Sequence, residues 1–142
     1  VKLIQKVSSL TAGRVVWLYQ VVRQTASALS LRLGGHPQFV RPLIHPMAEG
    51  AAIAKKGAPL SEDETELVKG AAAASDNYAN FFGQQVFPAA SGVALIVGTM
   101  VEAGYDVTNV QIGLWSLPVF FIAIVFGYIQ SVWLDRKIGG KK

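Results

Sequence analysis

The residues best suited to chemistry lie in one stretch, Gly34 to Ala52, which reads GGHPQFVRPLIHPMAEGAA. It contains both histidines of the chain, His36 and His45, together with Arg41 and Glu49. A zinc site needs three or four well-spaced histidine, cysteine or carboxylate ligands, and two histidines that are each followed by proline do not supply them. The stretch therefore does not predict a metal site.

Motifs for covalent or phosphate chemistry are missing from the sequence. There is no glycine-flanked nucleophile of the G-x-S-x-G type, and Gly34-Gly35 is a dipeptide rather than a glycine-rich phosphate loop. The chain has no cysteine, which excludes thiol chemistry, disulfides and cysteine metal sites. We predict no enzymatic activity and no cofactor.

Three prolines in this stretch predict an interruption of the helix. Pro37, Pro42 and Pro46 remove backbone donors and are expected to prevent a continuous helix. Broken backbone at membrane depth must line a cavity or be buried in protein, and transporters bind small polar solutes at such breaks. Arg41 would then pair with a carboxylate and His36 would donate a hydrogen bond. The alternative is a cytoplasmic loop with Arg41 at the lipid headgroups.

The composition indicates a membrane protein. Of the 142 residues, 51% are hydrophobic and 15% are charged, against about a quarter charged in ordinary soluble domains. The net charge is +4, but the basic residues flank apolar segments instead of clustering with exposed aromatic residues. This pattern argues for a lipid bilayer as the environment and against nucleic acid as a partner.

Two long uncharged segments predict a transmembrane hairpin. Residues 77–101 and 107–134 carry no charge, and each exceeds the roughly 20 residues that cross a bilayer. We expect spans at about 80–101 and 111–132, joined by the acidic turn from Glu102 to Asp106. The first segment is the more polar, so its alternative is a helix buried inside a protein bundle.

The distribution of positive charge predicts the topology. Four basic residues follow the second span, whereas the turn between the spans has neither lysine nor arginine. Cytoplasmic loops carry the excess of lysine and arginine. The C-terminus is therefore expected in the cytoplasm, and the turn outside, in a multi-pass protein.

A helix is expected at residues 14–33, RVVWLYQVVRQTASALSLRL. At 100° per residue its polar side chains fall within an arc of about 120°; they are Gln20, Arg23, Gln24, Ser27 and Ser30. This helix lies either in the membrane interface with its arginine at the headgroups, or within the membrane with its polar stripe facing protein or a cavity. In the second case Arg23 is a functional candidate, because an ionisable group at depth needs a partner.

A further helix should begin at Ser61, because Ser61-Glu62-Asp63-Glu64 has the capping-box pattern and its acids suit the positive end of a helix. The helix continues towards Asp76 and Asn77, where the charged part of the chain meets the first apolar segment. Asp76 is either a boundary residue or a carboxylate that couples transport to a proton or cation.

Four blocks of sequence carry a family resemblance: TAGRVVWLYQVVRQ, GGHPQFVRPLIHPMAEGAA, AAAASDNYANFFGQQVF, and the GLWSLP span that ends in WLDRKI. From about Thr11 to Ile138 the chain resembles the bacterial membrane family catalogued as domain of unknown function 969. Members of that family are described as the smaller subunit of a 5-oxoproline (pyroglutamate) transporter. They are longer at the N-terminus, so the chain resembles their C-terminal portion.

The resemblance implies a bacterial inner-membrane protein that acts with a second, larger membrane subunit to take up 5-oxoproline. This anion carries one carboxylate and a lactam with one N–H and one C=O, so its site needs a cation, an acceptor and a donor. We expect Arg41 to bind the carboxylate and Asn77 or Gln84 the lactam. The full set of expected substrate-binding residues is His36, Arg41, Glu49, Asp76, Asn77 and Gln84.

The sequence thus predicts an all-α, integral membrane protein that forms a single membrane domain over 1–142. Its expected parts are an amphipathic or embedded N-terminal helix, a proline-broken segment and a C-terminal transmembrane hairpin. Its expected function is that of a transporter subunit for a small organic anion. The alternative is a non-transporting scaffold or assembly subunit, in which the proline segment packs on a partner that alone binds the solute.

Overall fold

The computed structural model describes residues 10–31 and 33–139, and all regular secondary structure in these residues is helical. The helices run in the order α2 (Ala12–Ala28), η1 (His36–Ile44, a π-helix), α3 (His45–Lys56), α4 (Glu62–Gln84), α5 (Ser91–Glu102), α6 (Asn109–Trp115) and α7 (Leu117–Gly139). The predicted all-α class is confirmed.

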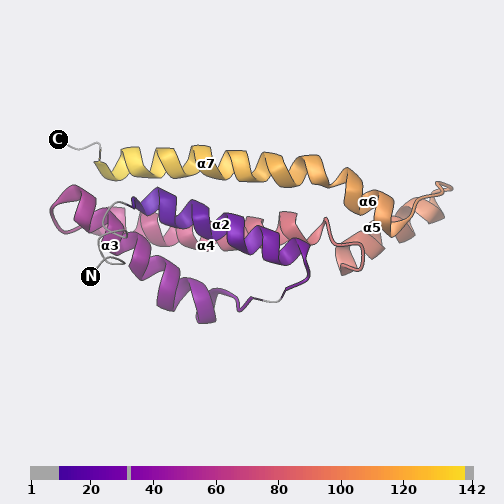
Figure 1. The fold of residues 1–142 in the computed structure, drawn as a ribbon, viewed down its shortest axis with the longest axis horizontal. Coiled ribbons are helices and arrows are strands. Elements are labelled where there is room, and N and C mark those ends of the chain that lie inside the picture. The colour runs from indigo at the N-terminus through magenta and orange to yellow at the C-terminus, as the bar shows by residue number, and fades with distance from the viewer. Residues whose placement is uncertain (1–9, 32, 140–142) are drawn as a thin grey trace.

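Three long helices form the body of the molecule. Figure 1 shows α2, α4 and α7 side by side along the long axis, with α3 on the flank of α2 and α4, and α5 and α6 projecting beyond one end. Small residues let these helices pack closely. The core joins α2, α3, α4 and α7 through residues that include Val16, Tyr19, Ala48, Ala52, Val68, Ala72 and Leu134.

The start of α4 follows the predicted capping box. The amide of Glu64 donates to Oγ of Ser61 over 3.3 Å, and the amide of Ser61 donates to Oε2 of Glu64 over 2.7 Å. Two otherwise free backbone donors are thereby satisfied. The expected helix start at Ser61 is confirmed.

The proline-rich stretch is helical from His36 onwards, after Gly34 and Gly35, so the expectation that its prolines prevent a continuous helix is wrong. Pro37 lies in the first turn of η1, where a proline costs no intrahelical hydrogen bond, and Pro46 lies at the start of α3, which follows η1 directly. Pro42 lies inside η1, which has the wider π geometry instead of continuing as an α-helix. The prolines change the type of helix, and the main break lies just before them.

That break begins where α2 ends, five residues before the predicted end at residue 33. Ser30 adopts a left-handed conformation with φ of 59°, and the amide of Leu31 donates to the carbonyl of Ala26 over 2.8 Å. This is a Schellman ending with serine at the position usually taken by glycine. Because no glycine marks this position in the sequence, the pattern of polar residues does not show that α2 ends at Ala28.

The second expected span agrees with a single long helical run. Residues Asn109 to Gly139, that is α6 and α7, are long and apolar enough to cross a membrane. The first expected span, at about 80–101, is not one helix: α4 ends at Gln84 and the apolar α5 begins at Ser91. Pro88 lies in the connection, and its carbonyl accepts a hydrogen bond from Nδ2 of Asn109 over 2.9 Å. This contact with α6 stabilises the segment between α4 and α5.

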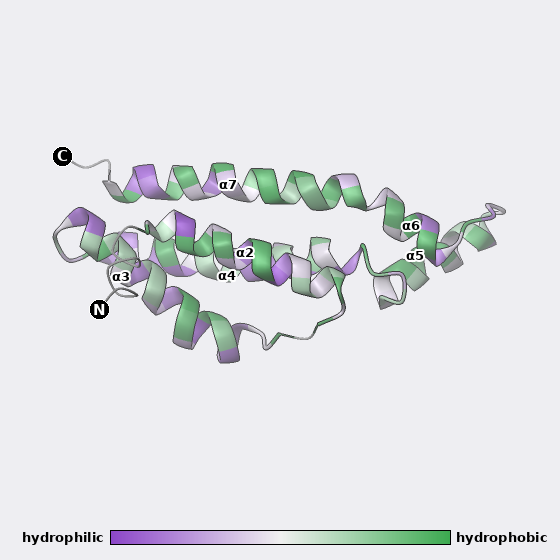
Figure 2. Ribbon diagram, viewed as in Figure 1, coloured by the Kyte–Doolittle hydropathy of each residue, from purple (hydrophilic) through white to green (hydrophobic). Residues whose placement is uncertain are grey.

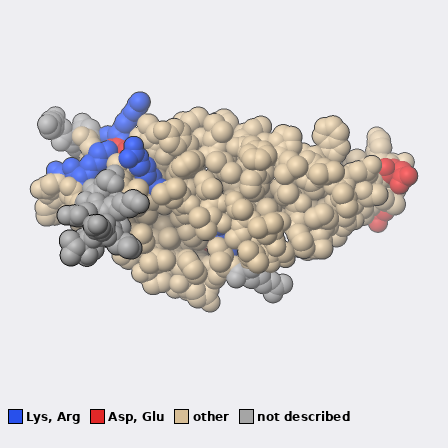
Figure 3. Space-filling model, viewed as in Figure 1, with Lys and Arg blue, Asp and Glu red and all other residues tan. Residues whose placement is uncertain are grey.

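Polar and apolar residues separate along the molecule. Figure 2 shows α7 as mainly hydrophobic over its central turns. On the face in Figure 3, Lys and Arg gather at the end where α7 finishes, with a small acidic patch among them. A larger group of acidic residues lies at the opposite end, and other residues cover most of the surface between the two ends. Many large apolar side chains along α7 are exposed, among them Phe121, Ile122, Val125, Phe126 and Ile129.

Candidate functional site: a buried ion pair beside a polar pocket

The polar stripe of α2 faces the interior of the helix bundle. Gln24 is fully buried, and its Nε2 donates to the carbonyl of Phe120 in α7 over 2.7 Å. Nε2 of Gln20 donates to the carbonyl of Ala123 over 2.9 Å. On the other side of the helix Leu18, Val22 and Leu29 are exposed. Of the two alternatives for this helix, the structure supports a polar stripe that faces protein.

Glycines bring the neighbouring helices close enough for these contacts. A Cβ on Gly83 of α4 would lie 2.4 Å from the carbonyl oxygen of Gln24. A Cβ on Gly127 of α7 would overlap the side-chain amide of Gln20. Small residues let helix backbones approach where larger ones would clash. The inward stripe of α2 therefore depends on glycines in both partner helices.

An ion pair lies at the centre of this stripe. Nε of Arg23 in α2 lies 2.9 Å from Oδ1 of Asp76 in α4, and the two residues are only 7% and 4% exposed. Nη1 of Arg23 donates to the carbonyl of Leu33 over 2.8 Å, and the hydroxyl of Tyr19 donates to Oδ1 of Asp76 over 2.5 Å. Removing two charges from water is costly, and these added hydrogen bonds offset part of that cost.

Arg23 does not use all its donors. Its Nε–H is close to Asp76 but has no acceptor in hydrogen-bond geometry among the described residues. The attraction to Asp76 is therefore mainly that of two opposite charges at short range. A guanidinium has five N–H donors, so Arg23 can still donate hydrogen bonds to a further anionic partner.

His36 connects this ion pair to the surface. Its Nε2 lies 3.3 Å from Oδ2 of Asp76 and 3.2 Å from Oδ1 of Asn77, and its side chain is 32% exposed. The imidazole comes from η1, immediately after the break that follows α2. The carboxylate thus has partners from α2 and η1, and one of them reaches solvent.

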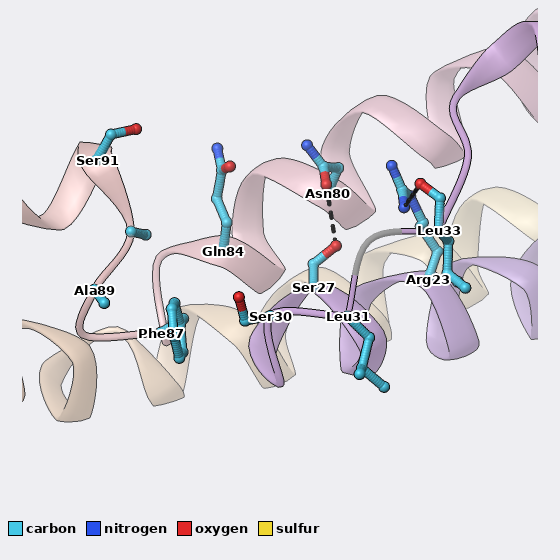
Figure 4. A pocket seen from close by; sticks show the side chains of 11 residues that line it. Arg23, Ser27, Ser30, Leu31, Leu33, Asn80, Gln84, Phe87, Ala89 and Ser91 are labelled. Atoms are coloured by element: carbon cyan, nitrogen blue, oxygen red, sulfur yellow. Dashed lines mark hydrogen bonds between the residues drawn. The ribbon is translucent and has the colours of Figure 1, made fainter.

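A pocket of about 470 Å³ opens beside Arg23. Figure 4 shows its polar side chains, with Arg23 donating to Leu33 and Ser27 donating to Oδ1 of Asn80, a hydrogen bond of 3.0 Å. Both breaks in the helices contribute to its wall: Ser30, Leu31 and Leu33 after α2, and Phe87, Ala89 and Ala90 after α4. The lining combines a cation, hydroxyls, carboxamides and apolar groups: Arg23, Ser27, Ser30, Leu31, Leu33, Asn80, Gln84, Phe87, Ala89, Ala90 and Ser91.

The family model for "Protein of unknown function (DUF969)" matches residues 1–139, nearly the whole chain. The chain belongs to the DUF969 family. No curated protein and no solved structure matches it.

The DUF969 structure separates the expected substrate-binding residues into groups. His36, Asp76 and Asn77 lie together around the ion pair, and Gln84 lines the adjacent pocket. Arg41 is exposed on η1 and is absent from the pocket lining. These positions do not support Arg41 as the residue that binds a carboxylate there.

Glu49 is the other expected residue that lies outside the pocket in the DUF969 chain. Its Oε2 is 3.4 Å from Nε2 of His45, one helical turn earlier in α3. His45 and Glu49 therefore form a local pair on one helix face, separate from the Arg23–Asp76 ion pair.

Tyr19, Ser27 and Asn80 were not expected as site residues. Ser27 belongs to the polar stripe of α2, and Tyr19 lies one position before Gln20 on the same helix. The spacing of Asp76 and Asn80 by four residues places them on one face of α4. This spacing was the available signal for Asn80, whereas nothing local to Tyr19 identifies Asp76 as its partner.

Proposed function

We propose that this chain is a subunit of a bacterial membrane transporter that carries a small organic anion, 5-oxoproline, together with a second, larger membrane subunit. The observation that carries the proposal is the buried Arg23–Asp76 ion pair beside a polar pocket between two helix breaks. Ionisable residues inside membrane proteins commonly mark solute or ion pathways.

A membrane location is supported by the arrangement of charges. The continuous run from Asn109 to Gly139 spans 31 residues, which corresponds to about 46 Å at 1.5 Å per residue. This length exceeds a hydrocarbon core of about 30 Å. In the sequence, Arg136 and Lys137 lie at one end of the run, and Glu102 and Asp106 come shortly before the other. In this proposal the C-terminal end is cytoplasmic and the acidic turn is outside.

The buried polar stripe of α2 also supports this location. Its amides and arginine are buried while Leu18, Val22 and Leu29 are exposed. Water would favour the opposite arrangement, because exposure of apolar surface is unfavourable there. Lipid or a second apolar subunit makes the observed orientation favourable.

The pocket chemistry suits the proposed anion. The Arg23 guanidinium would bind the carboxylate, because charge-assisted hydrogen bonds to arginine are short and strong. The carboxamides of Asn80 and Gln84 can each donate to the lactam C=O or accept from its N–H. Leu31, Leu33 and Phe87 provide apolar surface for the ring methylenes. The second subunit would cover the open side of the pocket.

The proposal is tested by uptake of labelled 5-oxoproline in cells that express the full-length protein with its partner subunit. Arg23→Gln should lower the rate about 100-fold, because the anion loses its cationic partner in a desolvated site. Arg41→Gln is the matched control, since it removes the same charge from an exposed position. It should change uptake by less than about two-fold.

Equal amounts of each variant in the membrane must be verified, and Gln84→Leu provides a second pocket change that leaves the ion pair intact. It should weaken uptake while Arg23 and Asp76 remain paired. Normal uptake by both Arg23→Gln and Gln84→Leu would instead favour the non-transporting scaffold, with solute bound by the partner alone. No uptake by the wild type would reject 5-oxoproline as the substrate.

A further inference from the structure

We propose that the pocket binds its anion together with one proton, which His36 delivers to Asp76, so that the transporter is an electroneutral proton symporter. This inference rests on the proposed transport of an organic anion. It adds the coupling ion and assigns residues to it.

The first argument is the balance of charge in the buried site. Arg23 and Asp76 together are neutral, and both are almost completely buried. An anion that binds to Arg23 would leave one uncompensated negative charge in the site. Buried charge is strongly unfavourable without a partner. Protonation of Asp76 restores neutrality, because Arg23 then pairs with the bound anion alone.

The second argument is competition for one guanidinium. Arg23 lines the pocket and also contacts Asp76. Its Nε–H is not engaged in a hydrogen bond with Asp76, so the ion pair is held by charge more than by directed donors. When Asp76 becomes a neutral carboxylic acid, this attraction is largely lost. The guanidinium is then free to turn towards a carboxylate in the pocket.

The third argument is a route for the proton. His36 is partly exposed, and its Nε2 lies 3.3 Å from Oδ2 of the buried carboxylate. Imidazole takes up and releases protons near neutral pH. His36 can accept a proton at Nδ1 from hydronium, leaving water, and transfer the proton on Nε2 to Oδ2 of Asp76. The histidine then returns to its neutral form and Asp76 becomes the acid.

Among the residues that the structure describes, a small set of polar and charged groups faces Asp76. Tyr19 and Arg23 face it from α2, His36 faces it from η1, and Asn77 follows it on α4. Several charged groups on α3 and α7 have partners other than Asp76. Glu49 lies beside His45, Lys56 beside Glu64, and Asp135 accepts hydrogen bonds from Thr11 and from the amide of Gly13.

The test uses proteoliposomes that contain the full-length protein with its partner subunit and labelled 5-oxoproline outside. A pH gradient, alkaline inside, should drive accumulation, reaching about ten-fold for each pH unit if one proton accompanies one anion. A potassium diffusion potential at equal pH should drive none, because the combined substrate carries no net charge. Accumulation driven by sodium alone, or by the potential alone, would overturn the inference and leave the proposed function standing.

Variants test which residue carries the coupled proton. Asp76→Asn should lose accumulation driven by the pH gradient but retain exchange of labelled for unlabelled 5-oxoproline. Asp63→Asn, an exposed carboxylate in the first turn of the same helix, is the matched control and should behave as the wild type. His36→Gln should slow pH-driven uptake without changing the final accumulation ratio, because it removes the relay and keeps Asp76.

Two further outcomes separate the proposals. Full pH-driven accumulation by Asp76→Asn would exclude Asp76 as the proton carrier. Absence of 5-oxoproline uptake by the wild type under every gradient would overturn the proposed function and, with it, the coupling. The comparison of the pH gradient with the potassium diffusion potential uses only the wild type. It therefore tests the coupling even if Asp76→Asn folds poorly.

Discussion

Two regions of this DUF969 protein contain the same types of charged side chain in different surroundings. The Arg23–Asp76 ion pair is buried between α2 and α4, whereas Arg41 and Glu49 lie on η1 and α3, where Arg41 is exposed and Glu49 pairs within its own helix. The strength of an electrostatic interaction depends strongly on its exposure to water. The comparison teaches that burial, and not residue type, distinguishes the candidate site.

The largest expected difference between these regions is in stability. Asp76→Ala should destabilise the protein by about 3–5 kcal/mol, because it leaves the buried Arg23 without its counter-charge. Glu49→Ala should cost about 0–1 kcal/mol, since a partly exposed pair contributes little. Thermal unfolding of the purified protein in one detergent would measure both. A double variant, Arg23→Met with Asp76→Leu, should recover much of the lost stability, and failure to do so would contradict this account of the pair.

A smaller effect is expected from the packing that keeps the site buried. Gly83→Ala should destabilise by about 1–3 kcal/mol, because its Cβ would lie 2.4 Å from the backbone oxygen of Gln24. Gly50→Ala in α3 meets no atom within 4 Å, so it should stabilise that helix by up to about 1 kcal/mol. The same unfolding measurement tests the contrast. Equal effects of the two substitutions would show that the close approach of α2 and α4 is unimportant.

The smallest effect is expected at the junction of α3 and α4, outside the apolar part of the protein. Hydrogen bonds from Lys56 and from the amide of Ser61 lower the pKa of Glu64 from 4.5 to about 2. A lowered folded-state pKa gives stability that is present above the unfolded value and is lost as pH falls through the folded value. The stability due to Glu64 should therefore disappear between about pH 5 and pH 2.

Unfolding midpoints measured over this pH range for the wild type and Glu64→Gln should converge at the acidic end. Glu62→Gln is the control for a general loss of negative charge, because Glu62 is the exposed neighbour in the same helical turn. A constant difference between the wild type and Glu64→Gln at all pH values would contradict the linkage.

The fold was predictable where the signal is local. The capping box at Ser61 and the uncharged run that became α6 and α7 were both recognised from neighbouring residues. The break at residues 85–90 was not, because Pro88 alone does not show whether a helix bends or stops. A contact from Asn109, distant in sequence, holds that segment.

The site was only partly predictable for a related reason. Asp76, Asn77, His36 and Gln84 were recognised as candidates, and the structure places them around the ion pair and the pocket. The sequence favours Arg41 over Arg23, because the prolines near Arg41 predict an irregular, solute-binding backbone. In the structure Pro42 lies inside the π-helix η1, and Arg41 is exposed at the surface.

The sequence by itself determined that this protein is helical, where α4 begins, and that α2 has one polar face, because these properties depend on residues within a few turns of each other. Only the tertiary structure decided that this polar face turns inward and that Arg23 pairs with Asp76. That choice depends on glycines in α4 and α7 that admit α2 closely, and on the balance between desolvation and pairing of buried charges.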